Sequence, residues 1–332
     1  MKKGKILLVG YDEYFFSRGH RIYKCNITDG KQSFLTAVKN GIYTYFSANK
    51  YLRRLTRSEL FGLYELGKDF IILAKKGVFV YDSASNNIYK SLDIQRGSKP
   101  LNLCVLPNGH LFFGEYFQNM EKEAVNIYRS SDNGHSWQVA FTFAAGEINH
   151  IHGVFFDKFA SRIWVVTGDR ENECIIGYTE DEFESFHECL RGGQEYRTCQ
   201  LYFYPEYIVY ATDSQYIQNK VKCINRETLV IKDIQDIQGS AIKGGQVGNL
   251  SFLSTTVEPS DVNTDKYAHI WISKDGLHWE ERYKAKKDNM PSLFQFGTFE
   301  FPQYKDLSMI DTLYFNGRAL QGCDGIINQF VI

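Results

Sequence analysis

Short runs of apolar residues separated by turn residues dominate this sequence, and long runs with helical periodicity are absent. The clearest example is Leu101–Phe143, where four such runs follow one another with turns between them. Runs of this length that are rich in Val, Ile, Phe and Tyr are typical of half-buried β-strands. We therefore predict four strands in this unit: Asn102–Leu106, His110–Tyr116, Val125–Ser130 and Trp137–Phe143.

The same four-strand plan recurs along the chain with a period of about 40 to 50 residues, the spacing expected of propeller blades. Further units begin near Glu59, Ala241 and Phe294. Repetition of this kind predicts an all-β propeller of four-stranded antiparallel blades, seven of them, with six as the alternative. Two more complete units have the predicted strands Gly153–Phe156, Arg162–Thr167, Cys174–Thr179, Phe186–Leu190, Thr198–Tyr204, Tyr207–Thr212, Val221–Asn225 and Val230–Ile234.

The two ends of the chain are expected to meet in one blade. Gly325–Ile332 leaves the last unit unfinished, and the strands predicted near the N-terminus do not form a unit of their own. Pairing them would close the ring and remove an exposed sheet edge. Residues 1–332 would then form a single domain. The N-terminal strands in question are Lys5–Tyr11, Arg21–Cys25 and Ser33–Val38.

The amino-acid composition is typical of a β-rich protein and favours few helices. Hydrophobic residues make up 43% of the chain and aromatic residues 15%, with 25 Phe and 22 Tyr against 4 Met. Aromatic and β-branched side chains suit strands better than helical bundles. The best helical candidate, Ala48–Leu60, is short and lacks a continuous apolar stripe, so we interpret it as a connector.

Charge, hydropathy and cysteine usage exclude several functional classes. The 38 Lys and Arg residues balance 39 Asp and Glu residues, so no overall field attracts nucleic acid. No stretch approaches transmembrane length, and the apolar run after the basic start is too short for a signal peptide. The seven cysteines are odd in number and contain no CxxC pair, so no disulfide framework is indicated. We expect a cytoplasmic protein that contacts no membrane.

Three segments share a motif at corresponding points of their units, between the third and the fourth strand. Ser130–Trp137 reads SSDNGHSW and fits the Asp-box pattern S-x-D-x-G-x-x-W. Ser273–Trp279 reads SKDGLHW, one residue shorter, and Thr179–Phe186 reads TEDEFESF, a degenerate copy. On these residues, which cover units making up about half of the chain, the sequence resembles the sialidase-like β-propeller family with Asp-box (BNR) repeats.

The Asp box itself has a structural rather than a chemical role. Its Asp accepts hydrogen bonds from nearby backbone N–H groups, its Gly permits a positive φ, and its Trp or Phe packs between strands. Sialidases of the family also need an arginine triad, whose first member lies in an early FRIP-like motif that is missing here. Arg197 and Arg318 lie where such arginines could sit, but we do not expect sialidase activity.

Propeller geometry restricts where a site can lie. Connections between blades and loops between second and third strands emerge on one face, and the Asp boxes on the other. A concave mouth lined by both signs of charge, with His and Tyr, is what a polar ligand requires. The candidates before inner strands are His150, His152, Gln194, Tyr196, Arg197 and Lys243, and those after second strands are Glu115, Asp169, Asp213, Glu258 and Arg318.

No cofactor is expected, with one reservation. His150 and His152 are alternate residues of a predicted strand and would project to the same face, where two imidazoles can chelate a divalent metal. The sequence does not identify a third ligand. The glycine-rich segment 244–248 lacks the helix and the Lys-Ser/Thr of a phosphate-binding loop, and no G-x-S-x-G nucleophile elbow occurs.

Two functional hypotheses follow. The first is an enzyme acting on an acidic oligosaccharide or polysaccharide, since Arg197, Lys243 and Arg318 would place positive charge at one rim. A glycoside hydrolase would pair two carboxylates from among Glu115, Asp169, Asp213 and Glu258. A lyase would use Arg197 to neutralise a uronate, with His152 and Tyr196 as base and acid. The alternative is a non-catalytic propeller that binds a glycan or an unknown protein partner.

Overall fold

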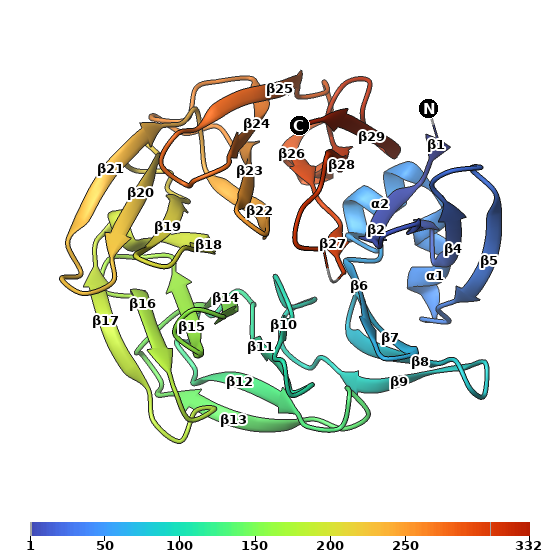
Figure 1. Cartoon of the computed structure of the whole chain (residues 1–332), viewed down its shortest axis with the longest axis horizontal. Coiled ribbons are helices and arrows are strands. Elements are labelled where there is room, and N and C mark those ends of the chain that lie inside the picture. Colours follow the sequence, from blue (N-terminus) through green and yellow to red (C-terminus); the bar gives the residue numbers. More distant parts are fainter. Residues whose placement is uncertain (1, 306) are drawn as a thin grey trace.

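The computed structural model describes residues 2–305 and 307–332. It is 51% strand and 6% helix, and its sheets are arranged around a central axis like blades (Figure 1). Four of them are four-stranded antiparallel meanders. Their strands are β6 (Gly62–Leu66), β7 (Asp69–Ala74), β8 (Gly77–Asp82), β9 (Asn87–Asp93); β10 (Cys104–Val105), β11 (Leu111–Gly114), β12 (Val125–Ser130), β13 (Gln138–Phe143); β14 (His150–Asp157), β15 (Arg162–Gly168), β16 (Cys174–Thr179), β17 (His187–Gly192); and β18 (Thr198–Phe203), β19 (Tyr207–Thr212), β20 (Lys220–Asn225), β21 (Ile231–Asp236).

A fifth sheet contains the N-terminal strands and a short strand from near the C-terminus. The first four strands form an antiparallel meander, and β27 pairs in parallel with β2. The members are β2 (Lys5–Val9), β3 (Glu13–Arg18), β4 (Arg21–Asn26), β5 (Gln32–Ala37) and β27 (Gln303–Tyr304).

The remaining eight strands belong to one sheet. A short pairing between β23 and β26, through Thr256 opposite Thr298 and Val257 opposite Gly297, joins its two halves. The strands are β22 (Ala241–Val247), β23 (Leu250–Val257), β24 (Tyr267–Ser273), β25 (Glu280–Lys286), β26 (Gly297–Glu300), β28 (Thr312–Arg318), β29 (Ile326–Val331) and β1 (Lys2–Lys3).

The meeting of the two chain ends differs in extent from the sequence-based expectation. Only Lys2 and Lys3 pair with the C-terminal strand β29, opposite Ile327 and Ile326. The strands from Lys5 to Ala37 form a complete meander of their own, so assigning them to the last sheet was wrong. The physical reason is that Phe15 and Ile22 pack against Leu63 and its neighbours in the next sheet, so these strands form a layer of their own.

The hydrophobic core is divided among the interfaces between neighbouring sheets. Among the described residues, seven clusters each join two adjacent meanders, as Phe112 of β11 and Val165 of β15 do in one of them. The last cluster joins Ile6 and Phe16 of the N-terminal sheet to Tyr314 of β28. Each sheet is therefore covered on both faces, which explains the near-continuous apolar runs of the second and third strands.

Two short helices connect β5 to β6: α1 (Ile42–Ala48) and α2 (Lys50–Thr56). The Asn49 side chain caps α2 by accepting from the N–H groups of Tyr51 and Leu52. The predicted connector Ala48–Leu60 overlaps α2, whereas α1 was missed because its sequence IYTYFSA is rich in residues that favour strands. Two 3-10 turns complete the helical content, η1 (Gln194–Tyr196) and η2 (Ser292–Phe294). No helix in the described part of the chain is long and apolar enough to cross a bilayer.

The three segments predicted as Asp boxes form three separate turns that share one hydrogen-bond pattern. In the first, the Asp132 carboxylate accepts from the Ser136 N–H (2.9 Å), and Ser130 Oγ accepts from the Gly134 N–H (2.8 Å). The corresponding bonds recur at Asp181 (2.9 and 3.0 Å) and at Asp275 (2.8 and 2.8 Å). In the degenerate copy Phe183 takes the place of the glycine and adopts a φ of 79°. Each box thus satisfies its own backbone, as its residues predicted.

Candidate functional site

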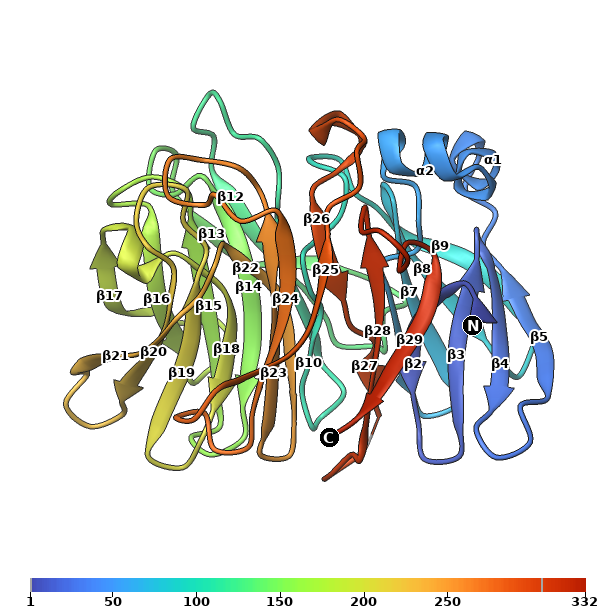
Figure 2. The same ribbon diagram turned by 90° about the horizontal axis from the view of Figure 1, so that it is seen from above.

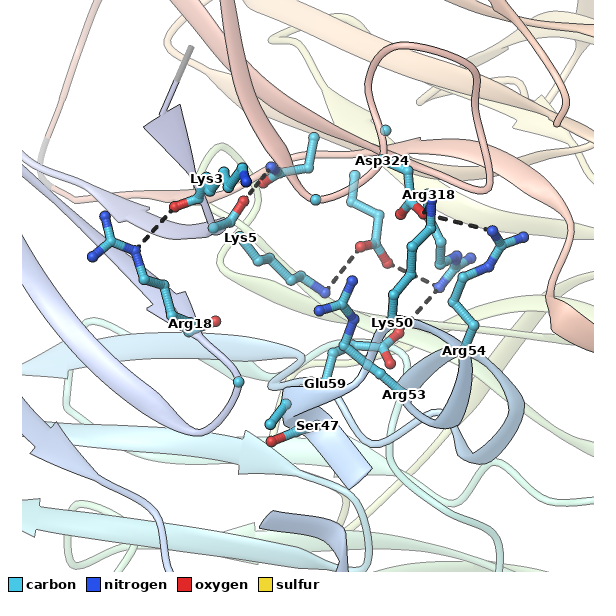
Figure 3. A pocket seen from close by; sticks show the side chains of 18 of the residues that line it. Lys3, Lys5, Arg18, Ser47, Lys50, Arg53, Arg54, Glu59, Arg318 and Asp324 are labelled. Atoms are coloured by element: carbon cyan, nitrogen blue, oxygen red, sulfur yellow. Dashed lines mark hydrogen bonds and ion pairs between the residues drawn. The ribbon is translucent and has the colours of Figure 1, made fainter. Parts of the chain in front are cut away.

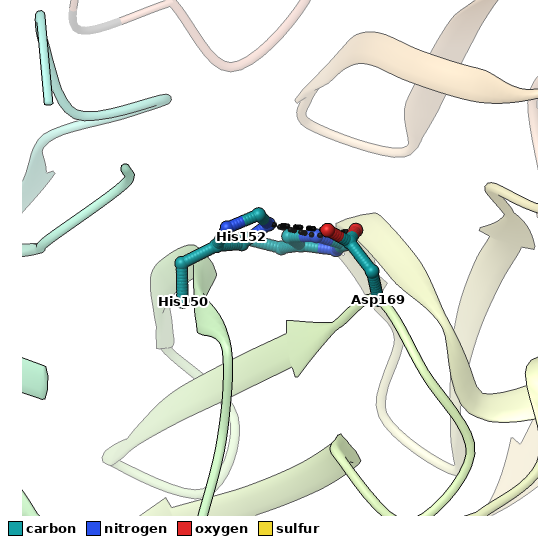
Figure 4. Close-up of side chains that lie close together, drawn as sticks. All are labelled: His150, His152 and Asp169. Carbon is teal, nitrogen blue, oxygen red and sulfur yellow. Dashed lines mark hydrogen bonds and ion pairs between the residues drawn. The ribbon is translucent and has the colours of Figure 1, made fainter. Parts of the chain in front are cut away.

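The loops opposite the Asp boxes bring the predicted histidines and several carboxylates together. His150 begins the inner strand β14, with His152 two residues later, and Asp169 follows the neighbouring strand β15. Arg197 precedes β18, and Asp213 follows β19. These positions are the ones expected from propeller geometry. Figure 4 shows both imidazoles directed at the Asp169 carboxylate.

The two imidazoles converge through their Nε2 atoms. His150 Nε2 lies 3.1 Å from His152 Nε2, and His152 Nε2 lies 3.3 Å from Asp169 Oδ1. His150 Nε2 lies 3.4 Å from Asp169 Oδ2. Both rings are buried, at 5% and 2% exposure, while the Asp169 side chain is 34% exposed. The cluster therefore reaches solvent on the side of Asp169.

Local backbone features make this convergence possible. A bulge in the β14–β15 ladder between Ile151 and Gly153 shifts the register at His152. Gly168, opposite His150, has no side chain, and a Cβ there would lie 2.4 Å from the His152 ring. The Tyr116 ring covers His150 with a centroid distance of 4.3 Å. A glycine and a bulge thus create the space that the two rings occupy.

Arg197 ties two of the carboxylates to this cluster. Its Nη2 lies 2.9 Å from Asp169 Oδ1 and 3.8 Å from Asp213 Oδ2. Burial opposes the ionisation of Asp169, but whenever His150 and His152 are protonated their hydrogen bonds and charge outweigh burial and hold the pKa of Asp169 well below the ordinary value. Glu258 behaves differently, because burial and the neighbouring charge of Asp213 raise its pKa to about 7. The cluster therefore combines anions with one acid that titrates near neutrality.

Other predicted site residues lie apart from the histidines. The Tyr196 side chain packs in the cluster that includes Leu201 and Tyr210. The Gln194 amide donates to the Asp169 carbonyl (2.8 Å) and orders that loop. Glu115 forms an ion pair with Arg96. The tyrosine beside the histidines is Tyr116, which was predicted only as the end of a strand, and burial raises its pKa far above the usual range.

Lys243 and Arg318 belong to a second cluster, in which four cations surround a single carboxylate. Glu300 Oε2 lies 2.9 Å from Lys5 Nζ, and Glu300 Oε1 lies 2.9 Å from Arg318 Nη1. Burial opposes its ionisation, yet Lys5, Arg318, Lys243 and Lys99 lower the pKa of Glu300. Within residues 2–305 and 307–332, neither Lys99 nor Lys243 has a carboxylate within ion-pair distance. Burial lowers the pKa of both lysines, and the charge of Lys243 lowers the pKa of Lys99 further.

A cavity of about 610 Å³ adjoins this cluster and shares Lys5, Glu300 and Arg318 with it. It lies between α2, the N-terminal sheet and the β28–β29 turn (Figure 3). The acidic residues on its wall are Glu59, Glu300 and Asp324. The basic residues are Lys3, Lys5, Arg18, Lys50, Arg53, Arg54 and Arg318. We call this site the basic pocket.

Several polar groups in the basic pocket lack hydrogen-bond partners. Glu59 is 8% exposed, and neither of its carboxylate oxygens has a hydrogen-bond partner among the described residues. Arg318 Nε also lacks one, and Asp324 Oδ2 accepts no hydrogen bond but lies 3.1 Å from Lys50 Nζ. Arg54, by contrast, is engaged with Asp288 and the Phe294 carbonyl, so it anchors α2. Buried polar atoms without a hydrogen-bond partner are uncommon in native structures.

The helices that border the basic pocket expose large apolar side chains. Tyr45 of α1 is 79% exposed and Tyr51 of α2 is 59% exposed. We call these side chains the helical apolar patch, comprising Ile42, Tyr45, Tyr51, Leu52 and Leu55. This patch was not predicted from the sequence, and neither were Lys5, Lys99 and Glu59. Lys99 lies in a blade connection and Lys5 begins the inner strand β2, so the position rule applied to the other candidates would have found both.

No family model and no curated protein sequence matches this chain. Solved structures do resemble it in fold. The structure of YCF48 bound to D1 peptide has a TM-score of 0.58 and 11% identity, over 99% of this chain and 94% of that one. A chain of the mitotic checkpoint complex has a TM-score of 0.57 and 9% identity, over 98% and 89%. The fold is a β-propeller. A prolyl endopeptidase also matches (TM-score 0.57, 11% identity), over 99% of this chain but only 50% of its own.

Proposed function

We propose that this protein is a binding propeller whose basic pocket holds an acidic segment of a partner protein. The carrying observation is that seven basic side chains face three carboxylates in one cavity. In the adjoining cluster, Lys99 and Lys243 add two cations to the single carboxylate of Glu300. Carboxylates of a ligand would complete these groups with charge-assisted hydrogen bonds.

The helical apolar patch favours a protein ligand over a glycan. Tyr51 projects from α2, which carries Lys50 and Arg53 on the wall of the basic pocket, and Tyr45 projects from the adjoining helix α1. Exposed aromatic and aliphatic side chains beside a charged cavity are typical of protein-binding surfaces. YCF48, a propeller of similar fold, is seen with a peptide, which supports the same use here. The partner segment would therefore combine acidic residues with apolar ones.

The proposed site lies where the two ends of the chain meet. We count seven blades, because the eight-stranded sheet divides at the short β23–β26 pairing into β22–β25 and a set made of β26, β28, β29 and β1. Seven core clusters between adjacent meanders support this count. On this count the basic pocket lies between the last blade and the first, over α2.

Fluorescence anisotropy with a labelled peptide tests this proposal. The peptide alternates Glu or Asp with Leu or Phe, and a matched peptide replaces each acid by its amide. We expect the acidic peptide to bind and to lose affinity as salt rises from about 0.05 to 0.5 M. The Arg53→Glu variant should weaken binding at least about tenfold, because it reverses a charge on the pocket wall. Lys232→Ala, on the exposed strand β21, is the control and should bind normally.

Equal binding of the acidic and the amide peptide would contradict the proposal, as would indifference to Arg53→Glu. An acidic oligosaccharide serves as a competitor in the same assay. Two results together would indicate a glycan ligand rather than a protein segment. The oligosaccharide would displace the peptide from the unmodified protein, and the acidic peptide would bind no tighter than its amide form.

A second candidate function is hydrolysis or elimination on an acidic oligosaccharide. It is supported by Glu258, whose pKa of about 7 suits a general acid and which lies near the ionised carboxylate of Asp213. Incubation of the protein with acidic oligosaccharides, followed by reducing ends and by ultraviolet absorbance, tests it. Reducing ends alone indicate hydrolysis, and both signals together indicate elimination. Absence of both signals, or activity unchanged in Glu258→Gln, would refute this candidate.

A further inference from the structure

The tautomers of His150 and His152 are fixed by backbone carbonyl groups. His150 Nδ1 lies 2.9 Å from the Phe117 carbonyl oxygen, and His152 Nδ1 lies 3.0 Å from the Thr198 carbonyl oxygen. A carbonyl oxygen only accepts, so each Nδ1 carries the proton and donates it. In the neutral rings each Nε2 then holds a lone pair. Metal-binding histidines are oriented by outer hydrogen bonds of this kind.

The two Nε2 lone pairs face each other, which is unfavourable without a positive charge between them. They lie 3.1 Å apart, inside hydrogen-bond distance, but neither neutral ring has a second N–H to donate. A proton or a metal ion would resolve the conflict. The nearby Asp169 carboxylate, at 3.3 and 3.4 Å from the two Nε2 atoms, would share the ion as a third ligand.

From this arrangement we infer that His150, His152 and Asp169 bind one divalent transition-metal ion. Ligand atoms at about 2.0–2.2 Å from an ion lie about 2.8–3.6 Å apart in octahedral or tetrahedral geometry. The 3.1 Å between the two Nε2 atoms falls in this range, as do the 3.3 Å from His152 Nε2 to Asp169 Oδ1 and the 3.4 Å from His150 Nε2 to Asp169 Oδ2. Two imidazoles and one carboxylate are ligands preferred by Zn²⁺, Co²⁺ and Ni²⁺ over Mg²⁺ or Ca²⁺.

The surrounding charges favour a cation. Asp169, Asp213 and Glu258 contribute three carboxyl groups, and Arg197 is the cation that faces them. Arg197 bonds to Oδ1 of Asp169, which leaves Oδ2 directed at His150. With three protein ligands and access from the Asp169 side, the ion would keep at least one open position, as sites that bind or activate a ligand do.

A neighbouring group of possible ligands fits less well. His152, Cys199 and Asp213 also lie close together. However, the Cys199 thiol donates to Asp213 (3.4 Å), so its sulfur is already engaged there. The Nε2 atoms of His152 and His150 each lie within 3.4 Å of an Asp169 oxygen instead. We therefore assign the ion to nitrogen and oxygen ligands, without Cys199.

Isothermal titration calorimetry of chelator-treated protein with Zn²⁺ tests the inference directly. We expect one ion per chain, weakening at least about 100-fold in His150→Phe and at least about tenfold in Asp169→Asn. Asp169 is partly exposed, so its variant keeps the test valid if His150→Phe fails to fold. Mg²⁺ should not bind. Absence of Zn²⁺ binding, or affinity unchanged in Asp169→Asn, would overturn the assignment.

His269, in strand β24 of another sheet, provides a matched control. It is also a buried histidine with carboxylate neighbours, Glu281 at 2.9 Å and Asp265 at 3.1 Å. These carboxylates face opposite ring nitrogens, so they cannot share one ion with the ring. His269→Gln should therefore leave Zn²⁺ affinity unchanged.

A Co²⁺ spectrum adds a readout of the ligand set. Visible d–d bands without a thiolate charge-transfer band in the near ultraviolet are expected from the three inferred ligands. A thiolate band that disappears in Cys199→Ser would overturn this set in favour of the sulfur-containing one. The inference is independent of the proposed acidic-segment binding, since no partner is needed in any of these measurements.

Discussion

The two faces of the propeller use polar side chains in opposite ways. On the Asp-box face, Asp132 accepts from the Ser136 N–H and hydroxyl at 2.9 and 2.6 Å, so its carboxylate is satisfied within one turn. On the opposite face, Glu59 is buried with no hydrogen-bond partner among the described residues, and Lys99 faces other cations. The Asp-box turns thus satisfy their polar groups locally, whereas the opposite face holds buried polar groups without hydrogen-bond partners. Substitutions should therefore lower the free energy of unfolding on the Asp-box face and raise it on the opposite face.

The largest effect is expected on the Asp-box face. Trp279 is buried between the sheets, and its indole N–H donates to the Gly276 carbonyl at 2.7 Å. Trp279→Ala should lower the free energy of unfolding by about 3–5 kcal/mol through lost packing. Urea unfolding measures this. A loss below about 1 kcal/mol would show that the aromatic residue of the box does not support the interface.

A stabilising substitution is expected on the opposite face, at Glu258. Its folded-state pKa of about 7 lies above the ordinary 4.5, so the folded protein holds this proton more tightly than the unfolded chain. The stabilisation this provides is complete below about pH 4 and is lost as pH rises to about 7. Glu258→Gln removes the titration and should gain up to about 3 kcal/mol relative to the unmodified protein between pH 4.5 and 8.5.

Urea unfolding of both proteins at the two pH values measures this change, and the titrating groups that do not interact with Glu258 cancel in the difference. A difference between the two proteins that is independent of pH would mean that Glu258 ionises normally. The same variant serves in the oligosaccharide assay, where it separates a chemical role from a contribution to stability.

A smaller loss is expected at Asp132. Asp132→Ala removes the acceptor of the Ser136 N–H and should cost about 1–2 kcal/mol. Asp132→Asn, which keeps one acceptor oxygen, should recover part of this. Peptide affinity and Zn²⁺ affinity should be unchanged at temperatures where the variant is folded. A loss of either affinity in folded Asp132→Ala would contradict the division of labour between the faces.

The sequence predicted the fold more fully than the site. The four-strand units are confirmed, because period and turn residues are local signals. The three predicted turns share one hydrogen-bond pattern, and His150, His152 and Asp169 lie together as the strand ends indicated. The sequence misplaced the N-terminal meander, since the partner of a strand depends on distant packing. It also grouped Tyr196 with His152, although its side chain packs with Tyr210 instead.

By itself, then, the sequence determined that the chain forms repeated β-meanders. It also determined turns on one face whose side chains satisfy their own backbone N–H groups, and polar loops on the other face. Only the tertiary structure decided which polar groups meet. The convergence of His150 and His152 depends on a bulge and on Gly168 in the next strand. The charge excess of the basic pocket depends on Arg53 and Arg318 arriving from opposite ends of the chain. Acidic and basic residues nearly balance over the whole chain. Only folding brings these basic side chains within a screening length of one another, so that their fields add.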